Sequence, residues 1–444
     1  MRDDTFIRDL GDGLVLRRAQ REDAEAVAKL NSEVFCNRET REPSEFMAAW
    51  TMDMLTRPHP TITPDDYTVV ERTEDGALVS SMVLISQTWS YDGVPFGVGQ
   101  PEVVVTRPEY RRKGLVRAQF EVAHRRSTEK GEMVQAITGI PFFYRQFGYE
   151  MTMDLGGSRS GAAADVPKLK EGQEERFAFR PATETDVPFL AEVYANAQQR
   201  SLVSCVRNEA IWRLDLLGRS DKGMRPEVRI IESTAGDPVG YITHNSRVRR
   251  GNLELWGLEL RPGVSWLAVM PAVLRYIKRT GEMIAAVDEK ETFHSYTLSL
   301  GRDHPAYQAV RASLPAEGSP YAWYLRVSDL PRFLLHIGPV LERRLAESIA
   351  VGHTGELKLS FYRSGLKMVF AEGKLEAVEP WQPMPEDEGN AGFSGLTFLH
   401  LVFGHHTTEE LRQVYPDTSP WGDEANVLLK ALFPKKASLV WPLA

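Results

Sequence analysis

A cluster of cations precedes a predicted helix near residue 115. The segment TRPEYRRKGLVRAQF, residues 106–120, follows the apolar run VVV and places Arg111, Arg112 and Lys113 directly before residues with helical spacing. The N-terminus of a helix carries unpaired N–H groups and a partial positive charge, so cations there cost free energy unless an anion binds. Gly114 would let the backbone approach such an anion closely. The segment therefore predicts a pyrophosphate cradle.

The alternative for this cluster is a solvated surface turn. Basic triplets are common at such turns, and an isolated R-x-x-G spacing occurs by chance. In this chain the strand signal, Pro108 and the helix signal fall in register around the triplet. This register favours the phosphate interpretation.

A second candidate is Tyr144 in the aromatic run PFFYRQFGYE. A phenol can donate a proton to a leaving group, and Tyr149 in the same run is the nearest competitor. The alternative is core packing, which is the default for a tyrosine among phenylalanines.

Three histidines near the C-terminus raise the question of a metal. His400, His405 and His406, with Glu409, stand close to a predicted helix end but have no cysteines beside them. The pattern matches no metal motif, so we expect no metal site.

The elements that must position these residues follow from periodicity. The first 157 residues predict, in order, a strand, two helices, three strands, a helix and a strand. The predicted segments are residues 13–19, 21–35, 45–55, 65–73, 77–89, 98–106, the helix after Gly114, and 133–140. Asp75-Gly76 marks the hairpin turn between the first two of the three strands.

The opening pattern repeats after a predicted linker. Residues 158–175 are rich in Gly, Ala and charge, which is typical of a domain boundary, and residues 177–194 then repeat the strand, Arg, Ala, polar cap and apolar helix of the start. The repeat predicts an internal duplication. Where the first copy has its basic triplet, the second has Arg261-Pro262-Gly263 alone, so we expect that it keeps the fold and lacks the phosphate site.

The character of the chain changes again at about residue 327. Residues 327–347 predict an amphipathic helix with Pro339 inside it, followed by alternating strands and further helices. We expect a third, separate α+β unit that ends in a strand-like segment, KASLVWPLA.

Composition limits the function classes. Charged residues make up 26% of the 444 residues, apolar residues 42%, and the net charge is −8, so there is no basic field for nucleic acid. Two cysteines, Cys36 and Cys205, cannot form a disulfide framework or a zinc site by themselves. The N-terminus lacks the apolar core of a signal peptide and no run reaches the length of a membrane span, so we expect a cytoplasmic protein.

The motifs together resemble a known family. VVVTRPEYRRKGLV resembles the acyl-CoA motif of the GNAT acetyltransferases, an apolar strand leading to R/Q-x-x-G-x-G/A, with Val116 in the last position in place of a small residue. With FYRQFGY and the three-part organisation, the chain resembles the Eis family. The resemblance implies an α/β (α+β) fold of two tandem GNAT acyl-CoA N-acyltransferase domains, the second degenerate, and a sterol carrier protein-like domain. The boundaries are 1–157 for the catalytic domain, 158–175 for the linker, 176–326 for the degenerate domain and 327–444 for the last domain.

The resemblance also assigns roles to residues. Acetyl-CoA would lie along the strand backbone with its pyrophosphate at the helix start, Tyr144 would protonate the leaving thiolate, and the terminal carboxylate of Ala444 would accept the proton of the amine. The implied cofactor-binding residues are Val104, Val105, Thr106, Arg111, Arg112, Lys113, Gly114, Leu115, Val116 and Arg117.

The implied reaction is transfer of acetyl from acetyl-CoA to a primary amine of a cationic small molecule, such as an aminoglycoside or a polyamine, by direct attack in a ternary complex. The resemblance further implies a homohexamer with a small-molecule amine as substrate, and neither nucleic acid nor membrane as partner. Two alternatives stay open: a protein lysine or N-terminal acetyltransferase, and a non-catalytic acyl-CoA- or lipid-binding protein.

Overall fold

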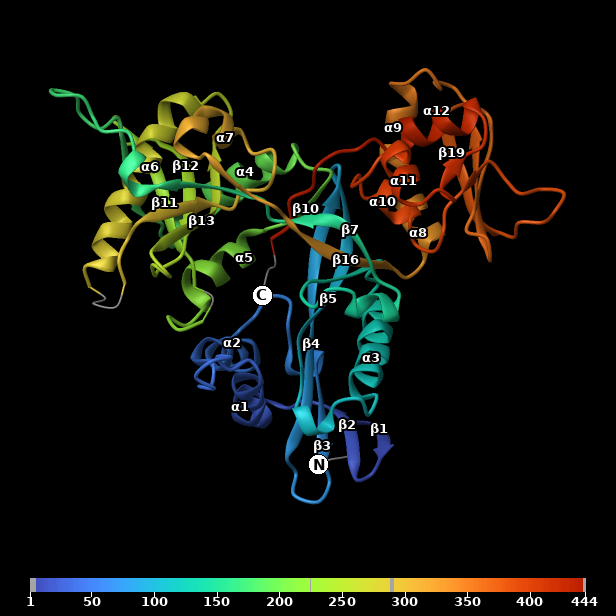
Figure 1. Cartoon of the computed structure of the whole chain (residues 1–444), viewed down its shortest axis with the longest axis horizontal. Coiled ribbons are helices and arrows are strands. Elements are labelled where there is room, and N and C mark those ends of the chain that lie inside the picture. Colours follow the sequence, from blue (N-terminus) through green and yellow to red (C-terminus); the bar gives the residue numbers. More distant parts are fainter. Residues whose placement is uncertain (1–4, 224, 288–290, 442–444) are drawn as a thin grey trace.

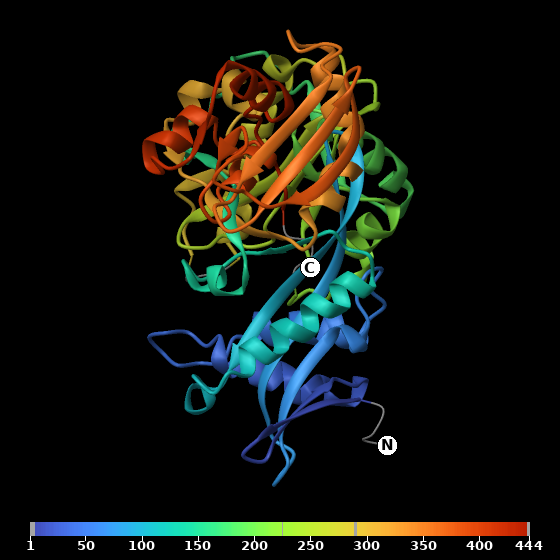
Figure 2. The same ribbon diagram turned by 90° about the vertical axis from the view of Figure 1, so that its right-hand side faces the viewer.

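The chain folds into three lobes around a central junction. The computed structural model describes residues 5–223, 225–287 and 291–441. The N-terminal unit forms a stem, and its long strands β4 and β5 rise to the junction where the second and third units meet it (Figure 1). Seen from the side, α3 lies along these strands in the stem (Figure 2).

A sheet of nine strands forms the first unit, in the order β1-β2-β3-β4-β5-β6-β16-β7 with β10 beside β4. Its strands are β1 Phe6–Gly11, β2 Leu14–Arg18, β3 Tyr67–Arg72, β4 Leu78–Tyr91, β5 Val94–Thr106, β6 Val134–Ile137, β7 Glu150–Leu155, β10 Val203–Cys205 and β16 Tyr321–Val327. Its helices are α1 Ala24–Val34, α2 Glu45–Thr56 and α3 Leu115–Glu129. The predicted elements occur in the predicted order, and the structure adds β1 before them and β7 after them.

Alternation along β4 explains how the helices cover both faces. Val83 and Ile85 pack with α1 and α2, whereas Met82 and Leu84 pack with Phe120 of α3. Successive side chains of a strand point to opposite faces, so an almost continuous apolar run is what a sheet buried on both sides requires.

The strand β16 joins the first sheet although it follows the second unit in the chain. Tyr324 lies opposite Ile137 of β6 on one side and Met151 of β7 on the other. The predicted second domain, residues 176–326, therefore ends too late: the apolar strand YAWYLRV fills the gap between β6 and β7 and buries Trp323, Tyr324 and Leu325 completely.

The second unit has a seven-stranded sheet in the order β15-β8-β14-β13-β12-β11-β9. Its strands are β8 Ser158–Ala162, β9 Phe177–Pro181, β11 Glu227–Ser233, β12 Pro238–His244, β13 Asn252–Leu260, β14 Ser295–Leu298 and β15 Ala316–Gly318. Its helices are α4 Val187–Gln198, α5 Glu209–Arg213, α6 Trp266–Ala285 and α7 Pro305–Ala309.

The predicted linker at 158–175 begins with a strand of this sheet. Gly161 of β8 lies against β14, and a Cβ there would come within 2.6 Å of the Tyr296 hydroxyl. At Gly161 the small residue in the predicted linker serves a close approach of packed backbone.

The first and second units share an ion-pair arrangement. Arg17 of β2 binds Asp23 and Glu71, each at 2.7 Å, and Arg180 of β9 binds Asp186 and Glu232, each at 2.7 Å. In both units the aspartate also caps the following helix as part of a capping box. Equivalent residues in equivalent places support the predicted internal duplication.

The third unit has a five-stranded sheet in the order β19-β18-β17-β20-β21. Its strands are β17 Gly355–Ser360, β18 Gly365–Ala371, β19 Lys374–Trp381, β20 Ala391–Gly392 and β21 Ser419–Pro420. Its helices are α8 Leu330–His336, α9 Gly338–Ala346, α10 Phe398–Val402, α11 Thr408–Val414 and α12 Asp423–Leu432. The single helix predicted at 327–347 is divided, because Pro339 takes the N-terminal end of α9.

The third unit shares its core with the first. Phe333 of α8 packs edge-on against Tyr91 and Phe96, at ring-centroid distances of 6.1 and 5.3 Å. In the described part of the chain no helix is long and apolar enough to cross a membrane.

Trp323 is the residue through which we test the role of β16. Replacing this buried tryptophan with alanine should cost about 3–5 kcal/mol of folding free energy, because it leaves a cavity between the first sheet and the third unit. We expect a lower melting temperature for Trp323→Ala by calorimetry. The control is Trp421→Ala, whose tryptophan is 40% exposed; equal shifts in both variants would contradict a central role for β16.

Candidate active site

The predicted anion cradle lies in the loop between β5 and α3. Arg112 has φ +63° and Gly114 has φ +78°, so two residues of this short loop adopt the left-handed conformation. Such a conformation turns successive N–H groups toward one concave point, a common anion site. Gly114 caps α3 without a side chain, and α3 has no acidic residue in its first turn, so the N–H groups at this helix start are available to a ligand.

The side chains around the cradle have different roles. Arg112 and Lys113 are exposed in the loop. Arg111 turns back, and its Nε donates to the carbonyl oxygen of Thr106 at 3.4 Å. Arg117, in the first turn of α3, donates to Gln146 at 3.2 Å, and Leu115 of the same turn is buried beneath it. Arg112 and Lys113 are thus exposed to a ligand, with Lys113 over the Tyr110 ring at 5.5 Å, whereas Arg111 and Arg117 are hydrogen bonded within the unit.

The strand before the cradle separates from its parallel neighbour. β5 pairs with β6 only at Val98↔Val134 and Gly99↔Gln135, and then continues alone on that side to Thr106. On its other side it stays bonded to β4, although the register shifts at Val103, whose φ of +49° marks a bulge. Val104, Val105 and Thr106 therefore present one free backbone edge, which leads to the cradle.

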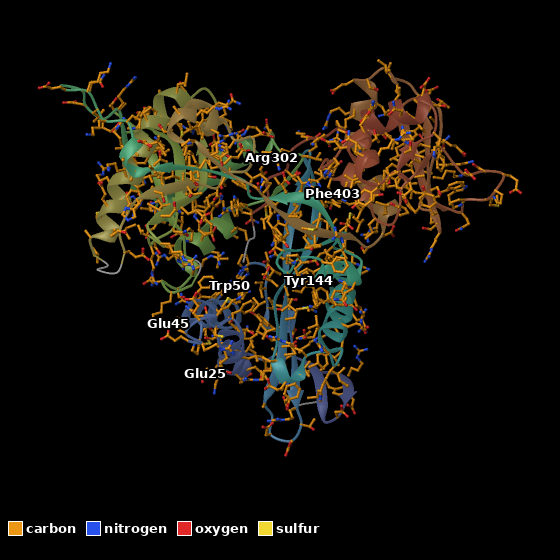
Figure 3. The ribbon with its side chains drawn as sticks, viewed as in Figure 1. Glu25, Glu45, Trp50, Tyr144, Arg302 and Phe403 are labelled. Carbon is orange, nitrogen blue, oxygen red and sulfur yellow. The ribbon has the colours of Figure 1, made fainter. Side chains whose placement is uncertain are left out.

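Tyr144 lies in the 3-10 helix η4, Phe143–Phe147, beside α3 (Figure 3). Its side chain is 4% exposed and packs against Phe120 and Tyr324, at ring-centroid distances of 6.0 and 5.6 Å. Burial, followed by the charge of Glu102, raises the pKa of Tyr144 far above its ordinary value. The phenol therefore stays protonated at neutral pH and remains a donor.

Sequence reasoning missed Glu102, which lies at the bulge of β5. Burial raises the pKa of Glu102 above its ordinary value, although hydrogen bonds from the Gln100 side chain at 2.8 Å and from the Val103 N–H at 3.2 Å act in the opposite direction. A carboxylate with a raised pKa is a stronger base than an exposed one. The sequence signal that could have identified Glu102 is its place as the single acid in the mostly apolar run VGQPEVVVT.

The C-terminal tail runs to the junction between the units. The Leu439 N–H donates to the Val203 carbonyl oxygen at 2.9 Å, and Trp323 Nε1 donates to the Val440 carbonyl oxygen at 3.1 Å. The strand predicted there is one extended segment with a single bridge, Ser204↔Leu439. Ala444, predicted as the catalytic base, lies outside the described residues, which end at Trp441.

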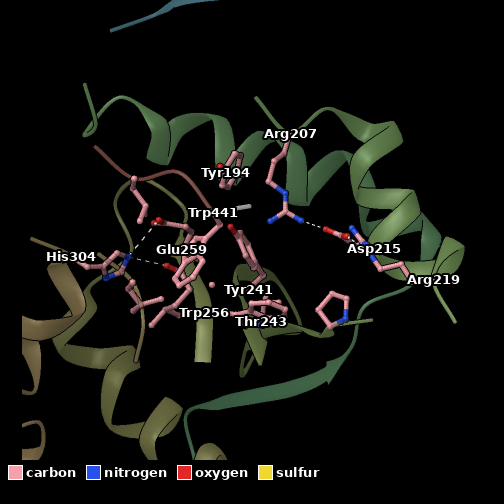
Figure 4. Close-up of a pocket in the computed structure, with 15 residues that line it drawn as sticks. Tyr194, Arg207, Asp215, Arg219, Tyr241, Thr243, Trp256, Glu259, His304 and Trp441 are labelled. Carbon is pink, nitrogen blue, oxygen red and sulfur yellow. Dashed lines mark hydrogen bonds and ion pairs between the residues drawn. The ribbon is translucent and has the colours of Figure 1, made fainter. Parts of the chain in front are cut away.

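A pocket in the second unit lies beside this tail. Its cavity of about 80 Å³ is lined by Trp256 and Glu259 of β13, by His304 and by Trp441 of the tail (Figure 4). Ion pairs such as Arg219–Asp215 at 2.8 Å and Arg200–Glu259 at 2.7 Å fix its walls.

A larger cavity opens between α2 and the second unit. It measures about 310 Å³ and shares Trp256 and Trp441 with the smaller pocket. Glu45 and Phe46 of α2 line one side, and Figure 3 labels Glu45. Its charged lining residues are Glu45, Asp221, Lys222, Arg225, Arg247, Arg249 and Glu254. The cavity has charges of both signs and is suited to a polar molecule.

Comparisons with known proteins agree with this geometry. Residues 15–152 match the family model described as acetyltransferase (GNAT) domain. The N-terminal unit is a GNAT acetyltransferase domain. A search of curated protein sequences finds no match to the chain.

Solved structures extend the likeness to the whole chain. A GCN5-related N-acetyltransferase from Kribbella flavida is 18% identical with a TM-score of 0.64, over 96% of this chain and 97% of that chain. A probable N-acyltransferase from Enterococcus faecalis is 15% identical with a TM-score of 0.67, over 96% and 97%. Eis1 from Mycobacterium abscessus is 14% identical with a TM-score of 0.60, over 96% and 98%. The fold is therefore Eis-like, and the findings support an acyltransferase that uses an acyl-CoA.

Arg112 and Lys113 provide a test of the cradle. Replacing both with alanine should weaken acyl-CoA binding roughly tenfold or more, about 1.4 kcal/mol, and make the remaining affinity less sensitive to salt, because two charges near the pyrophosphate are lost. Calorimetric titration with acetyl-CoA at low and high salt measures both effects. The matched control removes two exposed cations elsewhere, Arg125 and Lys170. Unchanged affinity in the first variant would contradict the cradle.

Proposed function

We propose that the chain is an N-acetyltransferase that transfers acetyl from acetyl-CoA to a primary amine by direct attack in a ternary complex. The observation that carries this proposal is the free edge of β5, which leads through the short 3-10 helix Pro108–Tyr110 to the left-handed residues before α3. An extended pantetheine could pair with Val104, Val105 and Thr106 while its pyrophosphate meets the N–H groups from Arg112 to Arg117. This arrangement holds the thioester near Tyr144 and Glu102.

Proton transfer requires a donor for the leaving thiolate and an acceptor for the amine proton. Tyr144 supports the first role, because burial keeps its hydroxyl protonated. This hydroxyl lies close to Gly139, since a Cβ on that glycine would be 3.6 Å from it. For the second role we keep the terminal carboxylate of Ala444 and add Glu102. A carboxylate is a weak base toward an ammonium, so we infer that it accepts the proton through water as the amine becomes acylated.

The acceptor is proposed to be a cationic small molecule, aminoglycoside-like or a polyamine. The cavity between α2 and the second unit is large enough for part of such a molecule and carries Glu45, Asp221 and Glu254. Its three arginines and one lysine outnumber these three acids, so the charge of the cavity alone does not select a polycation. A protein lysine or N-terminal amine is the alternative acceptor.

The remaining parts of the proposal concern the other units and the assembly. We infer that the second unit is a scaffold, that the third unit is sterol carrier protein-like and closes the acceptor cleft, and that the protein works as a cytoplasmic homo-oligomer, a hexamer by resemblance. A non-catalytic acyl-CoA- or lipid-binding protein is the alternative from another class.

Free-thiol release from acetyl-CoA tests the function directly. The untagged chain is mixed with acetyl-CoA and, in turn, with aminoglycosides, polyamines and lysine peptides. We expect amine-dependent thiol release with one class. Acetyl-CoA that raises the melting temperature without thiol release in any mixture would favour the binding protein instead.

Tyr144 is tested against its neighbour. Tyr144→Phe should lower kcat roughly 10²–10⁴-fold with acetyl-CoA affinity retained, because only the proton donor is lost. The control is Tyr149→Phe, which removes a hydroxyl bonded to His124 at 2.8 Å in the same aromatic cluster. Equal losses of kcat in both variants would assign the effect to packing.

The two candidate bases can be separated by pH. If Glu102 accepts the proton, kcat/KM rises with pH through its raised pKa, and Glu102→Gln loses this acidic limb together with most of the rate. If the terminal carboxylate acts, a short extension beyond Ala444 abolishes activity and Glu102→Gln keeps the limb. The pH profiles of both variants decide between the two groups.

A further inference from the structure

Three histidines come together at the turn between α10 and α11, away from the acyl-CoA site. One ring nitrogen from each of His400, His405 and His406 lies within 4.8 Å of the other two. The spacing of these histidines in the sequence, HLVFGHH, matches none of the usual metal-binding motifs. The turn itself brings the rings together.

The turn is fixed at both ends. The N–H groups of His405 and His406 donate to the carbonyl oxygen of His400, at 2.9 and 3.3 Å, which folds the chain back over the end of α10. Gly404 has φ +62°, and a Cβ there would meet the Leu202 side chain at 2.5 Å. Thr407 then caps α11 in a capping box with Glu410. The backbone therefore holds the three rings in place without a ligand.

The distances suit tetrahedral coordination. His400 Nδ1 and His405 Nδ1 are 3.2 Å apart. Two nitrogens bound to one Zn²⁺ at about 2.0–2.1 Å in a tetrahedral site lie roughly 3.3 Å apart. The ring nitrogen of His406 lies within 4.8 Å of the other two, and its half-buried side chain would complete the set of three ligands.

The protonation pattern also suits a metal. Asp154 of β7 accepts from His405 Nε2 at 3.3 Å, and since a carboxylate can only accept, this nitrogen carries the proton and Nδ1 presents its lone pair to the cluster. A carboxylate behind a ligating histidine is the usual outer partner in zinc sites.

Two nitrogens of the cluster are buried without a partner. His400 Nε2 and His406 Nδ1 find no hydrogen bond anywhere in residues 5–223, 225–287 and 291–441. Of these two, His406 Nδ1 is the nitrogen that could bind the ion, because His400 would bind through Nδ1 and its Nε2 lies on the other side of the ring.

We propose that His400, His405 and His406 form a Zn²⁺ site, with Asp154 as the positioning residue behind His405. Three neutral imidazoles suit zinc among the common divalent ions, and the fourth position stays open to water. The site joins the third unit to the catalytic one, because α10 packs against β7, and β7 follows the helix that carries Tyr144. Figure 3 shows Phe403, at the head of this turn, where the third unit meets the central strands.

Metal titration of the full chain tests the site. The protein is freed of any histidine tag, treated with a chelator and titrated with Co²⁺, whose tetrahedral complexes absorb visible light. We expect one Co²⁺ per chain, displacement by Zn²⁺, and a higher melting temperature with Zn²⁺. Absence of the absorption band or of a one-site isotherm would overturn the proposal.

Variants show which residues hold the ion. His405→Ala and His406→Ala change partly exposed side chains and should lower the affinity for Co²⁺ at least tenfold, and Asp154→Asn should lower it 10–100-fold. The matched control is His294→Ala, an exposed histidine of the second unit. Titration curves for the two cluster variants that coincide with those of the control would overturn the assignment. Acetyltransferase activity is not used as the readout, so the result is independent of the proposed function.

Discussion

The placement of β16 between β6 and β7 is the constraint on which the rest of the structure depends. The strand completes the catalytic sheet with residues that follow the whole second unit, so the first unit cannot close its sheet alone. It brings Tyr324 against Tyr144 and lets Trp323 hold the tail through Val440. Buried strand pairing and aromatic packing thus fix the aromatic cluster around Tyr144, the second unit and the tail relative to one another.

Duplication accounts for two similar sheets but not for two active sites. Both units keep the arginine that binds a capping aspartate, which shapes the turn into the first helix. The second unit also keeps a left-handed glycine, Gly263 with φ +84°, before its long helix α6. In place of the basic triplet it has Arg261 alone, which lies over the Phe189 ring at 5.1 Å, and Trp256 in the middle of β13 lines the pocket beside the tail. The second unit thus has the left-handed glycine before its helix but not the basic triplet that would make this helix start an anion site. The glycine also serves the turn from strand to helix, which folding requires.

Local signals were sufficient for much of this structure. The strand and helix order of the first unit, the cradle before α3 and the aromatic cluster around Tyr144 depend on periodicity and on residue types a few positions apart. The position of β16 could not be predicted, because strand pairing across 180 residues leaves no local pattern. Glu102 was missed because it is a single acid within an apolar run. The close approach of Gly161 to β14 was missed because small residues there were interpreted as a domain boundary. The histidines were visible in the sequence, but only the turn at Gly404 brings their rings together.

Tyr144 and Glu102 acquire opposite roles from one buried environment. Removal from water disfavours the charged form of both, so the phenol is held protonated and the carboxyl titrates closer to neutral pH. The charge of Glu102, once formed, further opposes ionisation of Tyr144. Both pKa values are raised, so a protonated phenol and a carboxyl that titrates above its ordinary pKa could serve as the proposed donor and acceptor in the same turnover. The bulge at Val103, which turns β5 away from its regular register beside Glu102, is therefore as much a part of the proposed chemistry as the cradle that follows it.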